Sequence, residues 1–167
     1  NYEDAIKFFL EAANIYQSSL GEEHTNFAES LNNIALMCKQ LGKYDIAEHY
    51  YTEAINIYNR VLGKNNPPSA IMLGNLGDLY ITMGDYVAAE LRLQWAVKTR
   101  RTVHGENHPN FAFSLHNLAA YYQIVGNYIA AEPRYRESLK ILRHSAGENH
   151  PNVAVILNHL AKLCAAT

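Results

Sequence analysis

The sequence predicts an all-α solenoid, because one unit of 42 residues is repeated along the chain. Glycine recurs at positions 21, 63, 105 and 147, and the segments that follow these glycines align without a gap. Two of the aligned segments read GENHPNFAFSLHNLA from Gly105 and GENHPNVAVILNHLA from Gly147. Within each unit, apolar residues twice follow the i, i+3, i+4, i+7 spacing of an amphipathic helix. A two-helix unit of this kind stacks on its neighbours and buries a strip of core along the array.

The first helix of each unit carries an apolar stripe, which runs from Leu31 to Cys38 in the unit that begins at Gly21. In the later units, proline marks the first helical position, where the missing amide hydrogen costs nothing. The residue before the proline then lies at the N-cap. The helix ends at a glycine, which favours the left-handed conformation of a helix C-terminus. The starts are marked by Asn66-Pro67, His108-Pro109 and His150-Pro151, and the ends by Gly42, Gly84 and Gly126.

The second helix of each unit begins at a tyrosine and alternates small and large residues, as Ala47, Tyr51 and Ala54 illustrate. This alternation lets neighbouring helices approach closely while the large side chain fills the gap between them. The opening residues of the chain repeat the same pattern, so the chain begins inside a repeat. Pro133 is expected to kink its helix slightly. The eight expected helices span residues 2–19, 25–41, 44–61, 67–83, 86–103, 109–125, 128–144 and 151–165.

These helices predict a single array over residues 1–167. The array comprises a partial repeat at 1–20, three repeats at 21–62, 63–104 and 105–146, and a partial repeat at 147–167. Both ends are expected to present apolar faces without a partner helix, which solenoids normally protect with a polar cap. We therefore expect the chain to be a fragment of a longer array.

Composition argues against nucleic-acid and membrane partners. The net charge of -2 leaves no basic excess to release counterions from a nucleic acid, and the chain contains no apolar run of about 18 residues. Residues 1–84 carry a net charge of -5 and residues 85–167 a net charge of +3, a split that we interpret as ordinary surface charge. The alternative is an electrostatic bias for head-to-tail stacking or for an acidic partner near the C-terminal half. Cys38 and Cys164 occupy the same position three repeats apart, so both are expected to be reduced, buried core residues of a cytoplasmic protein.

The pattern G-x-x-H-P-x-x-A-x-x-L-x-N-L-A, followed by G-x-Y-x-x-A-E, extends over the whole chain. It resembles the tetratricopeptide repeat in its 42-residue form, which is found in kinesin light chains. The resemblance implies a right-handed superhelix of about eight antiparallel helices. It also implies a non-catalytic scaffold that binds a peptide segment of a protein partner in a concave groove lined by the first helices. Three residues depart from the pattern, namely Thr25 in place of Pro, Asn66 in place of His and His159 in place of Asn.

In such a groove, the side chains available to a partner lie opposite the packed stripe of the first helices. Ile71 and Phe113 are apolar at these positions, and exposed apolar side chains in a concavity mark a partner surface. The alternative is that both pack against a neighbouring second helix. In kinesin light chains the resemblance implies an Asn that contacts the peptide backbone, and the matching positions hold Asn32, Gly74, His116 and Asn158. The candidate peptide-binding residues are Asn32, Lys39, Ile71, Gly74, Asp78, Phe113, His116, Gln123, Asn158 and Lys162.

Other classes of site find little support in the sequence. A clamp for a C-terminal carboxylate requires Lys and Asn at set positions, but the matching places mix Leu36, Asp78 and Ala120 with a single Lys162. The eight histidines lack the spacing of a metal-ligand set, and no phosphate-binding loop or catalytic pair is present. No metal, cofactor or catalytic residue is therefore expected. The alternative function is a structural module whose terminal helices stack end to end on another copy.

Overall fold

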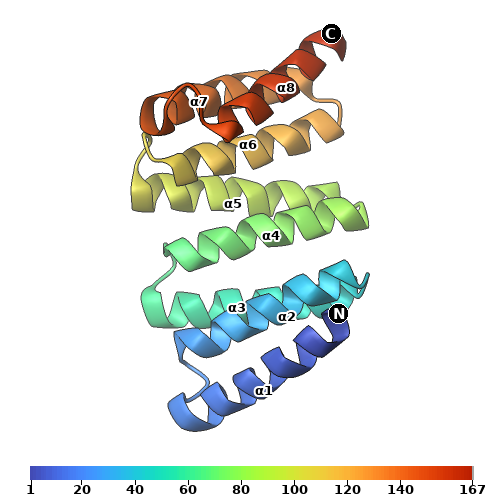
Figure 1. The fold of residues 1–167 in the computed structure, drawn as a ribbon, viewed down its shortest axis with the longest axis vertical. Coiled ribbons are helices and arrows are strands. Elements are labelled where there is room, and N and C mark those ends of the chain that lie inside the picture. Colours follow the sequence, from blue (N-terminus) through green and yellow to red (C-terminus); the bar gives the residue numbers. More distant parts are fainter. Residues whose placement is uncertain (167) are drawn as a thin grey trace. The chain divides into compact units, whose positions relative to one another are not determined.

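The computed structural model describes residues 1–166, and these form eight α-helices and no strand (Figure 1). Each helix lies within two residues of its predicted bounds. The predicted all-α architecture is therefore confirmed. The helices are α1 (Tyr2–Leu20), α2 (Thr25–Gln40), α3 (Tyr44–Leu62), α4 (Pro67–Met83), α5 (Tyr86–His104), α6 (Pro109–Ile124), α7 (Tyr128–Ala146) and α8 (Pro151–Ala166).

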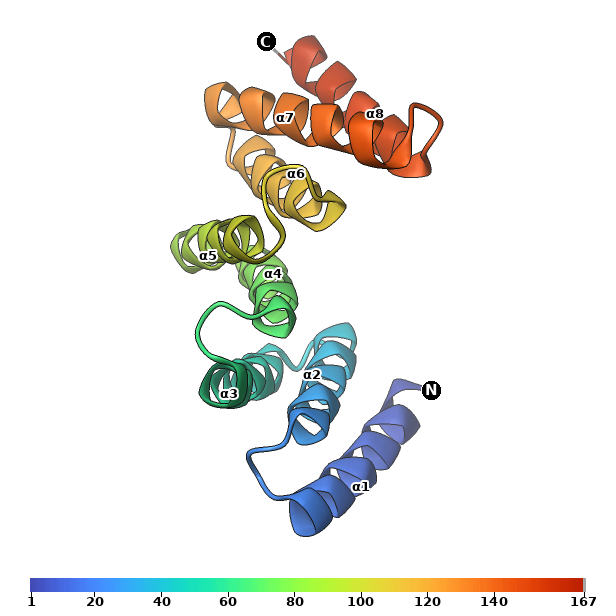
Figure 2. The same cartoon turned by 90° about the vertical axis from the view of Figure 1, so that its left-hand side faces the viewer.

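The helices group into two compact units, Asn1–Asp85 with α1 to α4 and Tyr86–Thr167 with α5 to α8. Within each unit every helix packs against the next one in sequence, as Figures 1 and 2 show. In addition, α2 contacts α4 in the first unit and α6 contacts α8 in the second. The first helices of successive repeats therefore lie next to each other within each unit. These helices carry the predicted peptide-binding residues.

The first helices begin where the sequence predicts, because a polar side chain caps each one. His24, His108 and His150 accept a hydrogen bond at Nδ1 from the backbone N–H two residues later, at 3.2, 3.0 and 3.2 Å. Asn66 caps α4 through Oδ1, which accepts from the backbone N–H of Ser69 at 2.8 Å. The Asn66 amide also donates to the carbonyl of Gly63 at 2.7 Å. Asn66, which replaces the histidine of the repeat pattern, therefore keeps the N-cap and adds a hydrogen bond to the preceding turn.

The ends of the first helices depend on glycine. Gly84 closes α4 with a left-handed backbone, at a φ of 80°. The Gly84 N–H donates to the carbonyl of Ile81 at 3.1 Å, and the Asp85 N–H donates to the carbonyl of Tyr80 at 3.0 Å. These bonds satisfy two carbonyls that the helix itself leaves without donors. The same pair of bonds recurs at Gly42 and Gly126, so the predicted role of these glycines is confirmed.

The core of each unit contains the small and large residues predicted for the second helices. Ala47, Tyr51 and Ala54 of α3 are all 0% exposed, and so are Ala131 and Tyr135 of α7. Alanine lets the backbones approach, while the tyrosine ring fills the space between α3 or α7 and the adjacent first helices. Truncation of such a ring to alanine typically costs about 3–5 kcal/mol. Pro133 lies inside α7, which continues to Ala146.

Two side-chain hydrogen bonds join helices at equivalent positions of successive repeats. The Tyr80 hydroxyl donates to Glu48 at 2.6 Å, and the Tyr122 hydroxyl donates to Glu90 at 2.6 Å. Each bond connects a first helix to the second helix that precedes it. The same position in α8 holds Cys164, and the matching carboxylate of Glu132 pairs with Arg136 of its own helix at 2.7 Å.

The prediction that both cysteines are buried is wrong for Cys164. Cys38 is buried, but Cys164 is exposed. In the same stripe of α8, Leu157 is 42% exposed, whereas the equivalent Leu31 and Leu115 are 3% and 5% exposed. The reason is that α3 covers the stripe of α2 and α7 covers that of α6, whereas within residues 1–166 no helix follows α8.

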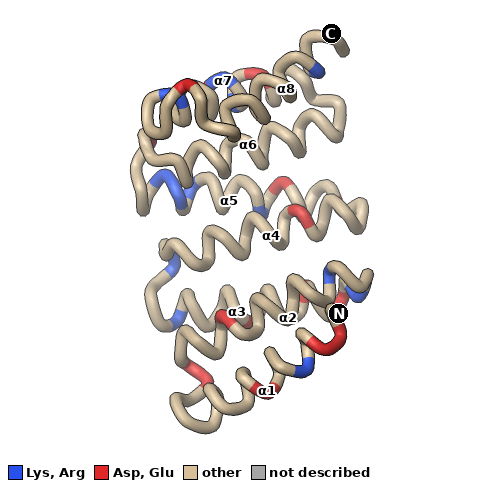
Figure 3. Tube along the Cα trace, viewed as in Figure 1, with Lys and Arg blue, Asp and Glu red and all other residues tan. Residues whose placement is uncertain are grey.

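Charge is distributed unevenly between the two units. Asn1–Asp85 contains five Lys and Arg residues against eleven Asp and Glu residues, and Tyr86–Thr167 contains nine against five. In the second unit all the Lys and Arg residues lie on α5 and α7, except Lys162 on α8. Figure 3 shows that α6 carries no charged residue. The two first helices of this unit therefore hold one charged side chain between them.

Candidate functional site

The first unit brings several of the predicted peptide-binding residues together on α2 and α4. The ammonium of Lys39 on α2 forms an ion pair with the carboxylate of Asp78 on α4. The Lys39 side chain is 16% exposed and that of Asp78 is 64% exposed, so the pair reaches from a half-buried position to solvent. Ile71 is 52% exposed nearby on α4, whereas Gly74 is buried. Neighbouring residues thus cover only about half of the Ile71 side chain.

Two buried polar atoms of the first unit lack a hydrogen-bond partner among residues 1–166, namely Asn32 Oδ1 and the Tyr51 hydroxyl. The Asn32 amide nitrogen lies 3.5 Å from Asn33 Oδ1, which is a weak contact. Burial, with smaller contributions from Asp78 and Cys38, raises the pKa of Tyr51 to about 12, so its hydroxyl stays protonated. A buried polar group without a partner costs about 1–3 kcal/mol.

In the second unit the predicted residue Gln123 belongs to a cluster that joins α6, α7 and α8. The Tyr135 hydroxyl lies 2.9 Å from Gln123 Oε1, and His159 Nδ1 lies 3.2 Å from both of these oxygens. Since Gln123 Oε1 only accepts, the cluster is satisfied when Tyr135 O–H and His159 Nδ1–H both donate to it. This arrangement assigns the Nδ1–H tautomer to His159. The rings of Tyr135 and His159 stack with centroids 5.2 Å apart.

His116 lies at the edge of this cluster and contacts both rings. Its centroid is 5.6 Å from that of Tyr135 and 5.0 Å from that of His159, with edge-to-face geometry in both pairs. Burial, followed by the proximity of His159, lowers the pKa of His116 to about 4, so the imidazole is neutral at pH 7. Its buried Nδ1 has no hydrogen-bond partner in the described part of the chain. Nδ1 is therefore an unsatisfied polar atom that solvent does not reach in this arrangement.

His116 and Asn32 occupy the same position of the repeat, 84 residues apart. Both carry a buried polar atom that needs a partner, one in each unit. The remaining two residues at this position differ, because Gly74 is buried and Asn158 is exposed. Lys162 is also exposed, and Phe113 is half-buried. The predicted residues therefore lie on the expected helices, but they do not form four equivalent contacts.

The site includes three residues that are not among the predicted peptide-binding residues, namely Tyr51, Tyr135 and His159. The repeat pattern predicts both tyrosines as packing residues. Their polar role could have been inferred, since a hydroxyl at a core position must find a hydrogen-bond partner. His159 also stood out because it departs from the Asn of the repeat pattern. What the pattern could not supply was the identity of the groups that face each hydroxyl across two helices.

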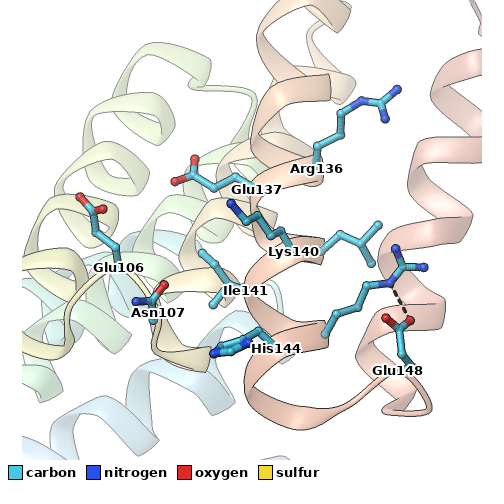
Figure 4. A pocket seen from close by; sticks show the side chains of 10 residues that line it. Glu106, Asn107, Arg136, Glu137, Lys140, Ile141, His144 and Glu148 are labelled. Atoms are coloured by element: carbon cyan, nitrogen blue, oxygen red, sulfur yellow. Dashed lines mark ion pairs between the residues drawn. The ribbon is translucent and has the colours of Figure 1, made fainter.

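A hollow of ≈ 780 Å³ lies along α7 in the second unit. Figure 4 shows the side chains that line it, with the ion pair between Arg143 and Glu148 drawn as a dashed line. Three cationic side chains face three carboxylates around this hollow, so its charges cancel. It therefore gives no indication of a binding site for an anion. The charged lining residues are Arg136, Lys140, Arg143, Glu106, Glu137 and Glu148.

Residues 1–166 contain neither a metal-ligand cluster nor a membrane span. No group of three or more His, Cys, Asp or Glu side chains lies close enough there to hold a metal ion. No helix in this range is long and apolar enough to cross a membrane.

Comparison with known proteins identifies the family. A family model described as "Tetratricopeptide repeat" matches residues 1–60, 26–102 and 110–167. Because these matches cover nearly the whole chain, the chain belongs to the tetratricopeptide repeat family. Arrays of this family are in general protein–protein interaction scaffolds, typically without catalytic activity. No curated protein matches the chain.

Solved structures with the same fold include proteins named as kinesin light chains. The crystal structure of BtubC (BKLC) from P. vanneervenii is 30% identical, with a TM-score of 0.79 over 90% of this chain and 59% of that one. The chain thus spans little more than half the length of that relative. A putative kinesin light chain from Podosopora anserina with nearly identical TPR-like repeats is 21% identical, with a TM-score of 0.81 over 99% of this chain and 78% of that one. Its Q17M variant is 20% identical, with a TM-score of 0.82 over the same shares. The predicted resemblance to repeats of the kinesin light chain type is confirmed.

Proposed function

We propose that the chain captures peptide segments of a protein partner on the faces formed by α2 and α4 and by α6 and α8. One observation carries the proposal: Asn32 Oδ1 and His116 Nδ1 are buried at the same position of the repeat, and neither has a partner within residues 1–166. A peptide backbone offers a donor and an acceptor at every residue, so it can satisfy either atom once the side chain turns out toward the bound segment. The exposed Ile71 and half-buried Phe113 would add apolar contact area beside these atoms.

The affinity of such a face for a short peptide would be modest. Ordering an extended segment costs conformational entropy, which only part of the buried apolar area and a few hydrogen bonds offset. The single charge on α6 and α8, Lys162, leaves little electrostatic attraction on the second unit's face. We therefore expect dissociation constants in the micromolar range, about -8 kcal/mol at 1 μM.

The proposal is tested with peptides selected on the chain itself. A phage-displayed random heptapeptide library is panned against the wild-type protein, and the affinity of the enriched peptides is measured by calorimetry. Replacement of both Phe113 and His116 by alanine is expected to weaken binding at least about tenfold, since it removes apolar contact and a hydrogen-bond partner together. Far-UV circular dichroism verifies that helicity is kept.

Ile129→Ala serves as the matched control, because Ile129 is 91% exposed on α7 of the same unit. It is expected to leave the affinity unchanged. A peptide that binds the first unit is expected to lose affinity with Asn32→Ala and Ile71→Ala instead. Affinity that is undiminished by both pairs of substitutions would refute the proposed binding faces.

The location and remaining partners form part of the same proposal. Both cysteines are free, and an exposed free thiol such as Cys164 is typical of a reducing compartment. We infer a cytoplasmic protein whose partners are proteins or peptides, with no nucleic acid or membrane among them.

End-to-end stacking is the second candidate function, and it is favoured by two uncovered helix faces. Leu157 of α8 is 42% exposed although its repeat equivalents are buried. Ile15 of α1 is 56% exposed, whereas the equivalent Ile57 and Ile141 are 1% and 7% exposed. In the repeat pattern, the face of α8 that carries Leu157 is covered by the second helix of the repeat. The face of α1 that carries Ile15 is covered by the first helix of the next repeat. Another copy of the chain can supply both helices, its α1 to this α8 and its α8 to this α1.

A further inference from the structure

Two histidines of the second unit lie at positions where the first unit holds asparagine. His116 on α6 and His159 on α8 have ring centroids 5.0 Å apart, in edge-to-face geometry. The same positions 84 residues earlier hold Asn32 and Asn75. An imidazole takes up a proton in mild acid, whereas an amide does not. The second unit therefore joins its two first helices through a contact that can titrate, and the first unit has no titratable group at these positions.

The contact leaves no room for an additional proton on His116. Tyr135 of α7 packs against both rings, with its centroid 5.6 Å from that of His116 and 5.2 Å from that of His159. His159 Nδ1 lies 3.2 Å from Gln123 Oε1, to which it donates. In an imidazolium both ring nitrogens carry a proton. Because His116 Nδ1 is buried and has no hydrogen-bond partner within residues 1–166, the charged form would bury an N–H group without an acceptor.

The groups on the three surrounding helices do not favour a positive charge here. Neither α6 nor α8 contains an Asp or Glu residue, and the charged residue of α8 is the cation Lys162. On α7, Glu132 pairs with Arg136, and Glu137 lines the hollow along that helix. Burial raises the pKa of Tyr135 to about 12, so its hydroxyl is neutral. A proton on either histidine would thus gain no carboxylate partner from α6 or α8.

The packed contact consequently lowers the basicity of both rings. Burial, followed by the proximity of His159, lowers the pKa of His116 to about 4. Burial, followed by the proximity of Lys162, also lowers the pKa of His159. If α6 and α8 separate, both rings regain the ordinary histidine pKa of about 6.5 and bind protons that the packed contact excludes. The contact therefore has its full strength above about pH 6.5 and weakens as the pH falls toward about 4.

We propose that the contact between His116 and His159 is an acid-sensitive switch, which holds α8 on α6 at neutral pH and destabilises the second unit in mild acid. In the first unit Asn32 and Asn75 keep the equivalent position insensitive to pH. The switch is a property of the folded chain alone. It stands or fails independently of peptide capture, because no peptide takes part in it.

Urea denaturation at pH 7.5 and pH 5.5 tests the switch. Trp95, the only tryptophan of the chain, lies on α5, so its fluorescence reports the unfolding of the second unit. Titration of His116 alone is expected to raise the unfolding equilibrium constant about tenfold between the two pH values. His116→Asn introduces the residue that the repeat holds at Asn32 and is expected to remove this tenfold part. A variant with the pH dependence of the wild type would overturn the proposal.

A control variant and a direct titration complete the test. His144→Asn, at an exposed position of α7 in the same unit, is expected to keep the pH dependence of the wild type. In the wild-type protein, NMR titration of the assigned imidazole Cε1–H resonances measures protonation without any substitution, so it applies even if His116→Asn does not fold. The His116 resonance is expected to titrate below about pH 5. A midpoint near the ordinary histidine value of about 6.5 would refute the switch.

Discussion

Tyr51 and Tyr135 occupy one position of the repeat, and both side chains are 0% exposed. Within residues 1–166 only the Tyr135 hydroxyl has partners, Gln123 and His159, whereas in the first unit the same places hold Lys39 and Asn75. Lys39 pairs instead with Asp78 on α4. Sequence alone predicts the burial of both rings from the repeat pattern. It cannot predict which hydroxyl is satisfied, because that depends on where the flexible lysine side chain turns.

This difference predicts unequal effects of one chemical change at two equivalent positions. Tyr135→Phe removes a satisfied hydroxyl and is expected to cost about 1–2 kcal/mol of unfolding free energy. Tyr51→Phe removes a buried hydroxyl that lacks a partner within residues 1–166, so it is expected to be neutral or to stabilise by up to about 1 kcal/mol. Urea denaturation of both variants measures the difference. Equal losses would show that Tyr51 is hydrogen-bonded in solution, for example by an ordered water.

At the scale of the helix, the boundaries follow from local chemistry and were therefore predictable. The capping side chain at His108 and the left-handed Gly84 are both visible in the sequence, and each lies where it was expected. The links between helices were less predictable. The hydrogen bonds from Tyr80 to Glu48 and from Tyr122 to Glu90 require two residues 32 apart to face each other. That relation appears only when the crossing of the two helices is known.

The recurring link predicts that α8 can be attached more firmly to α7. Cys164→Tyr places a hydroxyl at the position of Tyr80 and Tyr122, and Glu132 provides the matching carboxylate. The variant is expected to gain about 1 kcal/mol from the new hydrogen bond, less what Glu132 loses with Arg136. Thermal denaturation measures the gain.

Cys164→Phe is the control for this substitution, since it adds the ring without the hydroxyl. The interpretation is wrong if the two aromatic substitutions stabilise the chain equally. Glu132→Gln, combined with Cys164→Tyr in a double variant, should likewise reduce the gain.

At the scale of the whole molecule, a repeat architecture makes each helix dependent on its sequence neighbours. The fold class and the helix register could be read from the 42-residue period. The burial of individual residues in α1 and α8 could not be predicted from this period, because it assigns the same environment to equivalent positions of every repeat. Ala13 is the only buried residue of α1, and α8 has three, Val153, Ile156 and Leu163, among the described residues. In contrast, α4 has nine.

End-to-end stacking predicts that the chain associates with itself through these two faces. Sedimentation is expected to shift with protein concentration for the wild type. Leu157→Lys is expected to reduce the shift, because a lysine at the uncovered stripe of α8 would be desolvated in the contact. Ile129→Lys, at a 91% exposed position of α7, is the control. A strict monomer at high concentration would exclude this function.

The positions of the glycines that end the first helices select a residue by its backbone conformation rather than by the size of its side chain. A Cβ added at Gly84 would meet no atom within 4 Å among the residues described, yet the φ of +80° is one that L-residues rarely adopt. An L-alanine there would be strained by about 1–2 kcal/mol. The mirror-image D-alanine has its preferred backbone angles in this region and would lose less conformational freedom on folding than glycine does. The turn after α4 is therefore encoded by stereochemistry, and a chemically synthesised chain could carry a D-residue at this turn without any change to the packed core.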